Sequence, residues 1–406
     1  MRVAGLFVFV AALYVAGFSS AIAQRTGAFA ESLNHPAILY STTAANTVVD
    51  ELNRKLAGGS ATLTFDEQSG YLKSVLDLLK VPVESQVLVY SPTSQQAEKI
   101  NPQNPRAVYF NDNVSVGYVR GGGILEIVAQ DARLGSVFYV IHQEAGAARN
   151  LGREQQCLRC HLSWDTLGVP GMSVLSTFPR RTKDDYANGF FVDHYRPISE
   201  RWGGWYVTGK RVPARHMGNF PLFMPKLPQD GMVTPPPARV SMAGQFDLTS
   251  YLTPYSDIVA LLVLEHQVHA ANLITRANWE ARLKNPSRVA EAVETLVDYL
   301  LFIDEAPISA GGIEGSSGFA EKFQATGPRD SKGRSLRELD LNARLMKYPL
   351  SYMIYSQAFQ ALPPAAKQMA LDRVGKILAG EITGPKYARL TPAIRQATAE
   401  ILKETK

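Results

Sequence analysis

The sequence predicts an α+β fold, with an antiparallel β-rich N-terminal half and a mainly α-helical C-terminal half. Two observations carry this prediction. Short runs of β-branched and aromatic residues, separated by turn residues, fill the region 86–141. Apolar residues recur at helical spacing from residue 256 onwards. A proline-rich stretch at 213–237 separates the two regions and is the best candidate for a linker.

The N-terminal half begins with two predicted helices, at 47–56 and 70–80, whose leucines and valines recur at helical spacing. Pro82 ends the second helix. The strands that follow are predicted at 87–90, 107–110, 114–119, 124–129 and 137–141. Three glycines at 121–123 form a turn signal between two of these strands. We therefore expect consecutive strands to pair as an antiparallel meander.

The rest of the chain changes from strands to helices. Two further β-rich stretches are predicted at 189–194 and 205–208. Beyond the linker, helices are predicted at 256–283, 287–305, 335–346, 350–361, 364–378 and 392–403. The glycine- and serine-rich stretch 311–333 is predicted as a loop. The apolar runs in this half are too short to cross a membrane.

Composition limits the classes of partner. The chain has 406 residues, of which 46% are hydrophobic and 19% charged, as in folded globular proteins. Its formal net charge of +5 is small for this length, and no run of lysine or arginine occurs. A nucleic-acid partner is therefore not expected.

The N-terminus has the three parts of a secretory signal peptide. Met1 and Arg2 form a positive start, residues 3–17 are almost wholly apolar, and Ala-Ile-Ala at 21–23 is a cleavage signal before Gln24. We expect an exported, periplasmic protein that is not an integral membrane protein once the signal has been removed.

The two cysteines of the chain, Cys157 and Cys160, are followed directly by His161, which is the attachment sequence of a c-type haem. Thiols three residues apart lie on one face of a helical turn, so both can form thioether bonds with the vinyl groups of haem. The imidazole that follows can then ligate the iron. We predict one covalently attached haem c, with His161 as axial ligand and the β-rich half around the site.

This prediction completes the expected division of the chain. The segments are a signal peptide at 1–23, a helix pair with a β meander at 24–150, a haem-attachment region with the proline-rich linker at 151–245, and a helical domain at 246–406.

Three other roles for the cysteine pair are open. A thioredoxin-like pair would begin the first helix of a strand-helix-strand unit, but residues 162–171 are typical of a loop. A zinc site would need two further ligands, and the chain has no other cysteine. A structural disulfide would close so small a loop that it would constrain the unfolded chain little.

The group on the other side of the iron decides the function. A second strong ligand gives an electron carrier, whereas an open site permits chemistry on oxygen or peroxide. We predict His216, on a loop rich in turn residues, as the sixth iron ligand or as a distal catalytic residue. The other candidates for a sixth ligand are His194, Met172, Met217, Met224 and Met242.

His266 and His269 are three residues apart and share one face of the helix predicted at 256–283. We predict His266 as a distal catalytic residue, the alternative being a half-buried helix whose histidines bond to their neighbours. Their spacing does not match the zinc protease motif. Candidates for binding the haem propionates are Arg180, Arg181 and Arg215.

Through Cys157, Cys160 and His161 the chain resembles the c-type cytochromes. It is also similar, over most of its length, to a group of exported single-haem bacterial proteins, through the segments 104–112, 168–171, 201–209 and 264–267. The resemblance implies a monohaem cytochrome that transfers electrons with a redox partner protein or a small-molecule oxidant. Because one haem needs only about 100 residues, two alternatives stay open: a peroxidase-like or oxygenase-like haem enzyme, and a haem-based sensor.

Overall fold

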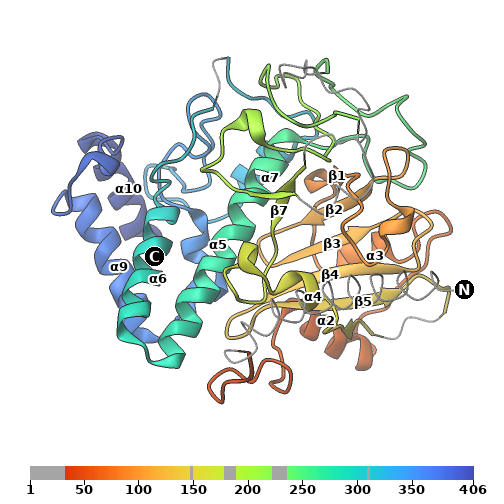
Figure 1. Ribbon diagram of the computed structural model, residues 1–406, viewed down its shortest axis with the longest axis horizontal. Helices are drawn as coiled ribbons and strands as arrows, with labels where there is room; N and C mark the ends of the chain where they lie inside the picture. Colours follow the sequence, from red (N-terminus) through yellow and green to blue (C-terminus); the bar gives the residue numbers. More distant parts are fainter. Residues whose placement is uncertain (1–32, 147–149, 178–188, 222–235, 309–310) are drawn as a thin grey trace, which may run out of the picture.

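The chain folds as the α+β protein that the sequence predicts (Figure 1). The computed structural model describes residues 33–146, 150–177, 189–221, 236–308 and 311–406. The strands are β1 Val87–Val89, β2 Arg106–Phe110, β3 Val114–Tyr118, β4 Ile124–Asp131, β5 Gly135–His142, β6 Gly152–Arg153, β7 Val174–Ser176 and β8 Phe190–Val192. The α-helices are α2 Val48–Ala57, α3 Leu72–Leu78, α4 Leu158–His161, α5 Ile258–Leu283, α6 Pro286–Leu300, α7 Phe319–Ala325, α8 Gln357–Gln360, α9 Pro364–Ala379 and α10 Pro392–Thr405. The 3-10 helices are η1 Val83–Ser85, η2 Ala97–Lys99, η3 Trp164–Thr166, η5 Ile198–Glu200, η6 Tyr352–Tyr355 and η7 Pro385–Tyr387.

The predicted meander is confirmed. Strands β1 to β6 form one antiparallel sheet in which each strand pairs with its neighbours in sequence. From β2 to β5 the connections between strands are short, which suits antiparallel pairing. Strands β7 and β8 form a separate antiparallel pair. The stretch predicted as a strand at 205–208 makes only isolated bridges, through Trp205 and Thr208.

The two faces of the sheet belong to different cores. Val87 and Val89 of β1 join the core around α5, whereas Leu88 between them joins the core that includes α2 and α3. This alternation follows from the two-residue side-chain period of a strand. The sheet therefore separates the N-terminal helices from the helical half.

Helix α5 lies at the centre of the molecule, between the sheet and helices α6, α9 and α10 (Figure 1). Its N-terminal cap residue is Asp257, whose carboxylate accepts hydrogen bonds from the backbone N–H groups of Val259 (2.8 Å) and Ala260 (3.2 Å). Among the described helices, only this one is long and apolar enough to cross a membrane, and 94% of its most apolar window is buried inside the protein. We therefore describe it as the core helix of the fold.

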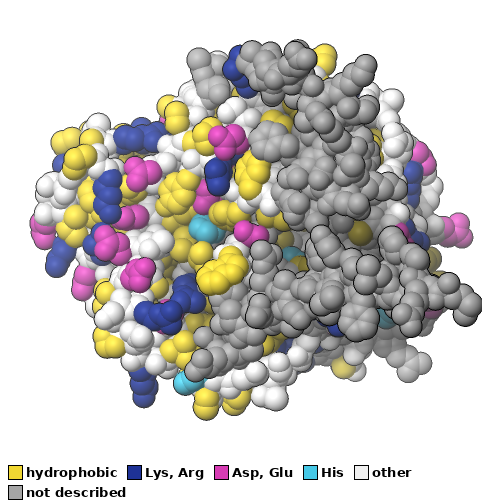
Figure 2. Space-filling view, in the orientation of Figure 1, with side chains coloured by type: hydrophobic (Ala, Val, Ile, Leu, Met, Phe, Trp, Pro, Cys, Tyr) yellow, Lys and Arg dark blue, Asp and Glu magenta, His cyan; other side chains and the backbone are white. Residues whose placement is uncertain are grey.

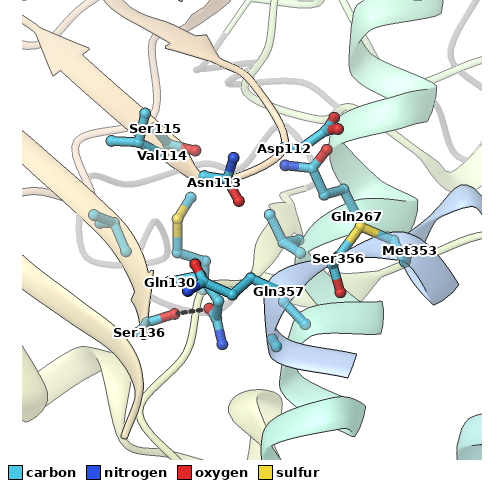
Figure 3. Close-up of a pocket in the computed structure, with 15 residues that line it drawn as sticks. Asp112, Asn113, Val114, Ser115, Gln130, Ser136, Gln267, Met353, Ser356 and Gln357 are labelled. Atoms are coloured by element: carbon cyan, nitrogen blue, oxygen red, sulfur yellow. Dashed lines mark hydrogen bonds between the residues drawn. The ribbon is translucent and has the colours of Figure 1, made fainter. Parts of the chain in front are cut away.

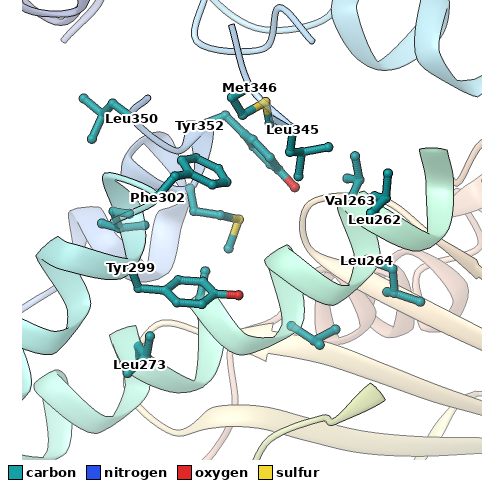
Figure 4. Close-up of a cluster of buried hydrophobic side chains, with 14 of the residues drawn as sticks. Leu262, Val263, Leu264, Leu273, Tyr299, Phe302, Leu345, Met346, Leu350 and Tyr352 are labelled. Atoms are coloured by element: carbon teal, nitrogen blue, oxygen red, sulfur yellow. The ribbon is translucent and has the colours of Figure 1, made fainter. Parts of the chain in front are cut away.

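Aromatic and aliphatic side chains pack α5 against the rest of the helical half. Figure 4 shows Tyr299 and Phe302 beside α5, with Tyr352 and Met346 approaching from the segment that follows. All four side chains are buried in the same core cluster. Val108 and Phe110 of β2 belong to the same cluster, so one hydrophobic core includes residues from both halves of the chain.

Three expectations in the helical half are wrong. Residues 335–346 form turns and bridges instead of a helix, because the Asp340 carboxylate accepts from the N–H groups of Asn342 and Ala343 and closes a local turn. The stretch 311–333 contains α7, whose residues Phe319 and Phe323 stack on each other (5.8 Å between ring centroids) and are buried. The helix predicted at 350–361 divides into η6 and α8.

The predicted signal peptide and part of the proline-rich linker lie outside the described residues. On the face in Figure 2, lysine or arginine and aspartate or glutamate side chains intermingle over the helical half. The described surface on this side therefore carries charges of both signs.

Candidate functional site

The cysteine pair lies on a single helical turn. Cys157 is the N-terminal cap residue of α4, and its carbonyl accepts hydrogen bonds from the N–H groups of Cys160 (3.1 Å) and His161 (3.0 Å). No disulfide joins the two thiols, and the Cys160 side chain is exposed. The turn thus presents both sulfur atoms and the imidazole within five residues of chain.

The ring of His161 has a defined orientation and tautomer. Its Nδ1 lies 2.9 Å from the carbonyl oxygen of Gly171, and because a carbonyl can only accept, Nδ1 carries the ring proton. Burial lowers the pKa of His161 below its usual value, so the ring is neutral. The Phe138 ring packs beside it, with 4.9 Å between centroids. Nε2 therefore keeps a lone pair that can ligate a metal.

The acceptor of this bond is clamped between β5 and α5. Gly171 donates its own N–H to the His161 carbonyl (3.0 Å), and the preceding residue, Pro170, accepts from the backbone N–H of Ser136 on β5 (3.1 Å). On the other side, Asn272 of α5 donates to the carbonyl of Met172 (2.7 Å). A side chain at position 171 would overlap the Asn272 amide, so only glycine fits here.

The thiol of Cys157 is not a reactive thiolate. Burial, followed by the charges of Glu154 and Glu126, raises its pKa to about 11. Catalytic and metal-binding cysteines instead have a lowered pKa. In addition, no group of three or more His, Cys, Asp or Glu side chains in the described part of the chain could hold a metal ion.

A charged pair lies on the sheet near this turn. The Arg106 guanidinium contacts the Glu126 carboxylate (3.2 Å between Nη1 and Oε2), and Ser94 donates to the other carboxylate oxygen (2.9 Å). Gln95 reaches the sulfur of Cys157, at 3.7 Å from its Nε2. The sequence did not identify these residues as part of a site. The only sequence signal for them was the occurrence of polar residues at strand positions that face inward.

His216 is buried, on the loop that the sequence predicts. Its Nδ1 accepts a hydrogen bond from the backbone N–H of Gly218 (3.0 Å), and burial lowers its pKa to about 4. The neutral ring then carries its proton on Nε2, which leaves no lone pair there for iron. Ligation through Nε2 would require this bond to break, so iron ligation by His216 stays a prediction.

His266 lies in a buried histidine cluster and not in an open site. Its Nδ1 is 3.0 Å from Nδ1 of His194, and its Nε2 is 2.6 Å from the hydroxyl of Ser351. Its ring stacks on those of Tyr299 and Phe302, at 5.1 and 4.4 Å between centroids. Both ring nitrogens of His266 are therefore occupied, as in the alternative of histidines that bond to their neighbours.

The third histidine of this region, His269, lies at the edge of the cluster. Its Nε2 is 3.8 Å from the Asp193 carboxylate, and its ring contacts Phe191 of β8, at 4.7 Å between centroids. The next residue of α5 on this face, Asn272, holds the loop that orients His161. The cluster and the loop that bonds to His161 thus meet the same face of α5.

The structure brings His216 close to this cluster. Its ring lies 5.7 Å from that of Trp202, whose indole N–H donates to Glu265, the residue before His266. No hydrogen bond or ring contact between described residues joins His216 or His266 directly to the Cys157–His161 turn. The roles predicted for His216 and His266 at a haem stay predictions, and the link between them through Trp202 was not expected from the sequence.

Of the remaining ligand candidates, Met172 can be placed relative to His161. It follows Gly171, whose carbonyl oxygen accepts from His161, and it lines a cavity of about 540 Å³ that includes open solvent. Figure 3 shows this cavity. This cavity lies between the sheet and α5, with Gln130, Ser136 and Gln267 around it.

The other candidates lie in several places. Met217 and Met242 are buried, and Arg215 is exposed. Met224, Arg180 and Arg181 lie outside the described residues.

Comparison with protein-family models, with curated proteins and with solved structures finds no match for this chain.

Proposed function

We propose that the protein binds one haem c covalently through Cys157 and Cys160, with Nε2 of His161 as an axial iron ligand, and that it is an exported electron-transfer protein. The observation that carries the proposal is the hydrogen bond between His161 Nδ1 and the Gly171 carbonyl (2.9 Å). It directs the proton to Nδ1 and leaves Nε2 as the ligating atom, as metal-binding histidines require.

The residues present fit the group. Two unbridged thiols on one turn suit two thioether bonds. When bound, haem would supply one-electron redox chemistry. The chain's own residues would hold the imidazole in place through Gly171 and Phe138 and limit the access of water to its buried ring.

Export is part of the proposal. It is supported by the signal sequence at 1–23 and by the presence of two unpaired thiols, which are unusual in an oxidising compartment unless they are consumed by a cofactor. A redox partner protein or a small-molecule oxidant would exchange electrons with the haem.

The test is the mass of the denatured protein, expressed with its signal peptide in a bacterium that attaches haem to exported proteins. We expect the mass of the mature chain plus one haem. Cys157→Ala with Cys160→Ala abolishes this addition, whereas Arg159→Ala, between the two cysteines, retains it. A wild-type protein without added haem mass would overturn the proposal.

A second candidate is a haem enzyme with an open sixth position. The observation that favours it is the bonding of the first ligand candidate: His216 Nδ1 accepts from the backbone N–H of Gly218. In this case His216, with its proton on Nε2, would be a hydrogen-bond donor on the distal side. A high-spin ferric spectrum that shifts on adding cyanide supports this candidate, and a low-spin spectrum that does not respond contradicts it.

A further inference from the structure

The cavity between the sheet and α5 has walls from both halves of the chain (Figure 3). One wall is formed by neighbouring ends of β3, β4 and β5, and the other by α5, η6 and α8. Among the described residues that line it, there is no lysine, arginine, histidine or aromatic side chain. Its one carboxylate, that of Asp112, is paired with the Arg337 guanidinium. The cavity is therefore a polar space without an unpaired charge, which suits an uncharged ligand.

Two glutamine amides on opposite walls are held in fixed positions. Gln130 of β4 accepts from the Ser136 hydroxyl (3.3 Å) and donates to the Thr275 hydroxyl (3.1 Å). Gln267 of α5 accepts from the Tyr352 hydroxyl (2.8 Å) and donates to a backbone carbonyl between β2 and β3 (2.7 Å). Because each amide is bonded through both its oxygen and its nitrogen, neither can rotate without losing a hydrogen bond. The walls are therefore already formed in the free protein.

Three other polar side chains that line the cavity, those of Asn113, Ser115 and Gln357, have no hydrogen-bond partner among the described residues. Ser115 is only 7% exposed, and it lies on the α5 face of β3 because Val114 and Val116 on either side join the core of α2 and α3. Asn113 and Gln357 are exposed and line the cavity from the sheet side and from α8. Because hydroxyl and amide groups both donate and accept, a ligand with hydroxyl groups can bond to both walls.

The remaining lining is apolar and includes two thioethers. Val268 and Ala271 lie three residues apart on one face of α5. Met172 comes from the loop beside β5, and Met353 from η6. Methionine side chains adapt to the shape of a ligand, and their sulfur atoms make favourable contacts with aromatic rings. Since the lining has no aromatic side chain of its own, the space beside these sulfur atoms is open to the ring of a ligand.

We propose that this cavity binds a small uncharged aromatic alcohol, with its ring on the apolar residues and its hydroxyl groups bonded to Ser115, Asn113 and Gln357. The volume of about 540 Å³, which includes open solvent, is that of a small-molecule site. The inference does not depend on haem attachment. Because Met172 directly follows Gly171, the ligand would contact the loop that orients His161.

The probe is resorcinol, a benzene ring with two hydroxyl groups, and the measurement is its dissociation constant from the purified protein by ligand-observed NMR titration. We expect a dissociation constant on the order of 1 mM, as for other ligands of this size. The cyclohexane diol with the same hydroxyl spacing lacks the aromatic ring and should bind about five-fold more weakly. Benzoate, which carries a charge that the lining does not neutralise, should bind about ten-fold more weakly or not at all.

Four variants locate the bound probe. Ser115→Ala and Gln357→Ala each remove one hydrogen bond to the ligand and should weaken resorcinol binding by about five-fold. Met353→Leu keeps the volume of the side chain and removes the sulfur, so it should reduce the preference for resorcinol over the cyclohexane diol. The matched control is Gln103→Ala, because Gln103 is also exposed but does not line the cavity. It should leave both affinities unchanged.

Each contrary outcome has a definite meaning. Resorcinol that does not bind well above 1 mM overturns the inference, and equal affinity for the cyclohexane diol overturns the aromatic ligand. Wild-type affinity in both Ser115→Ala and Gln357→Ala overturns the cavity as the site. If circular dichroism shows that Ser115→Ala does not fold, Gln357→Ala decides alone, since its side chain is exposed. Protein without haem overturns the proposed function and leaves this inference standing.

Discussion

Nδ1 of His161 lies 2.9 Å from the carbonyl oxygen of Gly171, and this one hydrogen bond sets the tautomer of the only histidine next to the cysteine pair. The acceptor is ten residues away in sequence, on a loop clamped between β5 and α5. The orientation of the imidazole therefore depends on how tightly this loop packs.

The fit of Gly171 against Asn272 can be tested by adding a methyl group. Gly171→Ala would place a Cβ atom in the Asn272 amide, so we expect a loss of about 2 kcal/mol in the free energy of unfolding. In the double variant Gly171→Ala with Asn272→Ala, the two effects should be non-additive by about 1 kcal/mol or more. Urea denaturation of the wild type, the two single variants and the double variant measures this coupling. Strictly additive changes in the free energy of unfolding would show that the two residues are not in steric contact.

Asp257 should contribute more stability than an ordinary helix cap. One carboxylate oxygen accepts from Val259 and Ala260, and the other from Ser316 (2.7 Å) and Ser317 (2.8 Å). Asp257→Ala leaves these buried N–H groups unpaired, with an expected cost of about 3 kcal/mol.

The control for Asp257 is Asn285→Ala at the start of α6. The Asn285 side chain accepts only from the backbone N–H of Arg288, so we expect Asn285→Ala to lower the free energy of unfolding by about 1 kcal/mol. Thermal or urea unfolding distinguishes the two, and equal losses would contradict the bridging role of Asp257.

Glu305 should make stability depend on pH. Burial raises its pKa from 4.5 to about 7, and Leu345 donates its backbone N–H to the carboxyl group. Because the folded-state pKa is the higher one, the stabilising effect of the protonated form is complete below about pH 4.5 and is lost as the pH rises through 7. Glu305→Gln stays neutral throughout.

The stability of Glu305→Gln relative to wild type should therefore rise by about 3 kcal/mol between pH 4 and pH 8. Urea unfolding of both proteins at each pH measures the difference. A constant difference over this range would show that Glu305 has the same pKa in the folded and unfolded states.

His266 provides a test of the predicted catalytic role. Its ring nitrogens bond to His194 and Ser351, so His266→Ala should cost about 3 kcal/mol in stability through lost packing and an unpaired partner. We expect no change in the absorption spectrum of bound haem. His142→Ala, at an exposed histidine, should change stability by less than about 0.5 kcal/mol. A shifted spectrum in His266→Ala would instead support a position beside the haem.

The local patterns of the sequence predicted much of the fold. The strands at 107–110, 114–119, 124–129 and 137–141 were recognisable because alternating or continuous apolar runs are bounded by turn residues. The helix at 335–346 was wrong although its periodicity is helical, because the Asp340 side chain closes a turn that competes with the helix.

The residues of the candidate site also fall into two groups, those that local sequence patterns predict and those that they do not. The cysteines and His161 were found because a covalent attachment motif is contiguous in sequence. Phe138, Gly171 and Asn272 could not be found, because each meets His161 or its loop only across the folded structure.

By itself, the sequence determined that a β meander precedes a helical half and that two thiols and an imidazole share one turn, because these features depend on residues close together in the chain. Only the tertiary structure decided which nitrogen of His161 is free, that His266 is enclosed by His194 and Ser351, and that Ser115 and Gln357 line one cavity. These properties depend on burial and on hydrogen bonds between distant segments, and local sequence patterns contain no information about either.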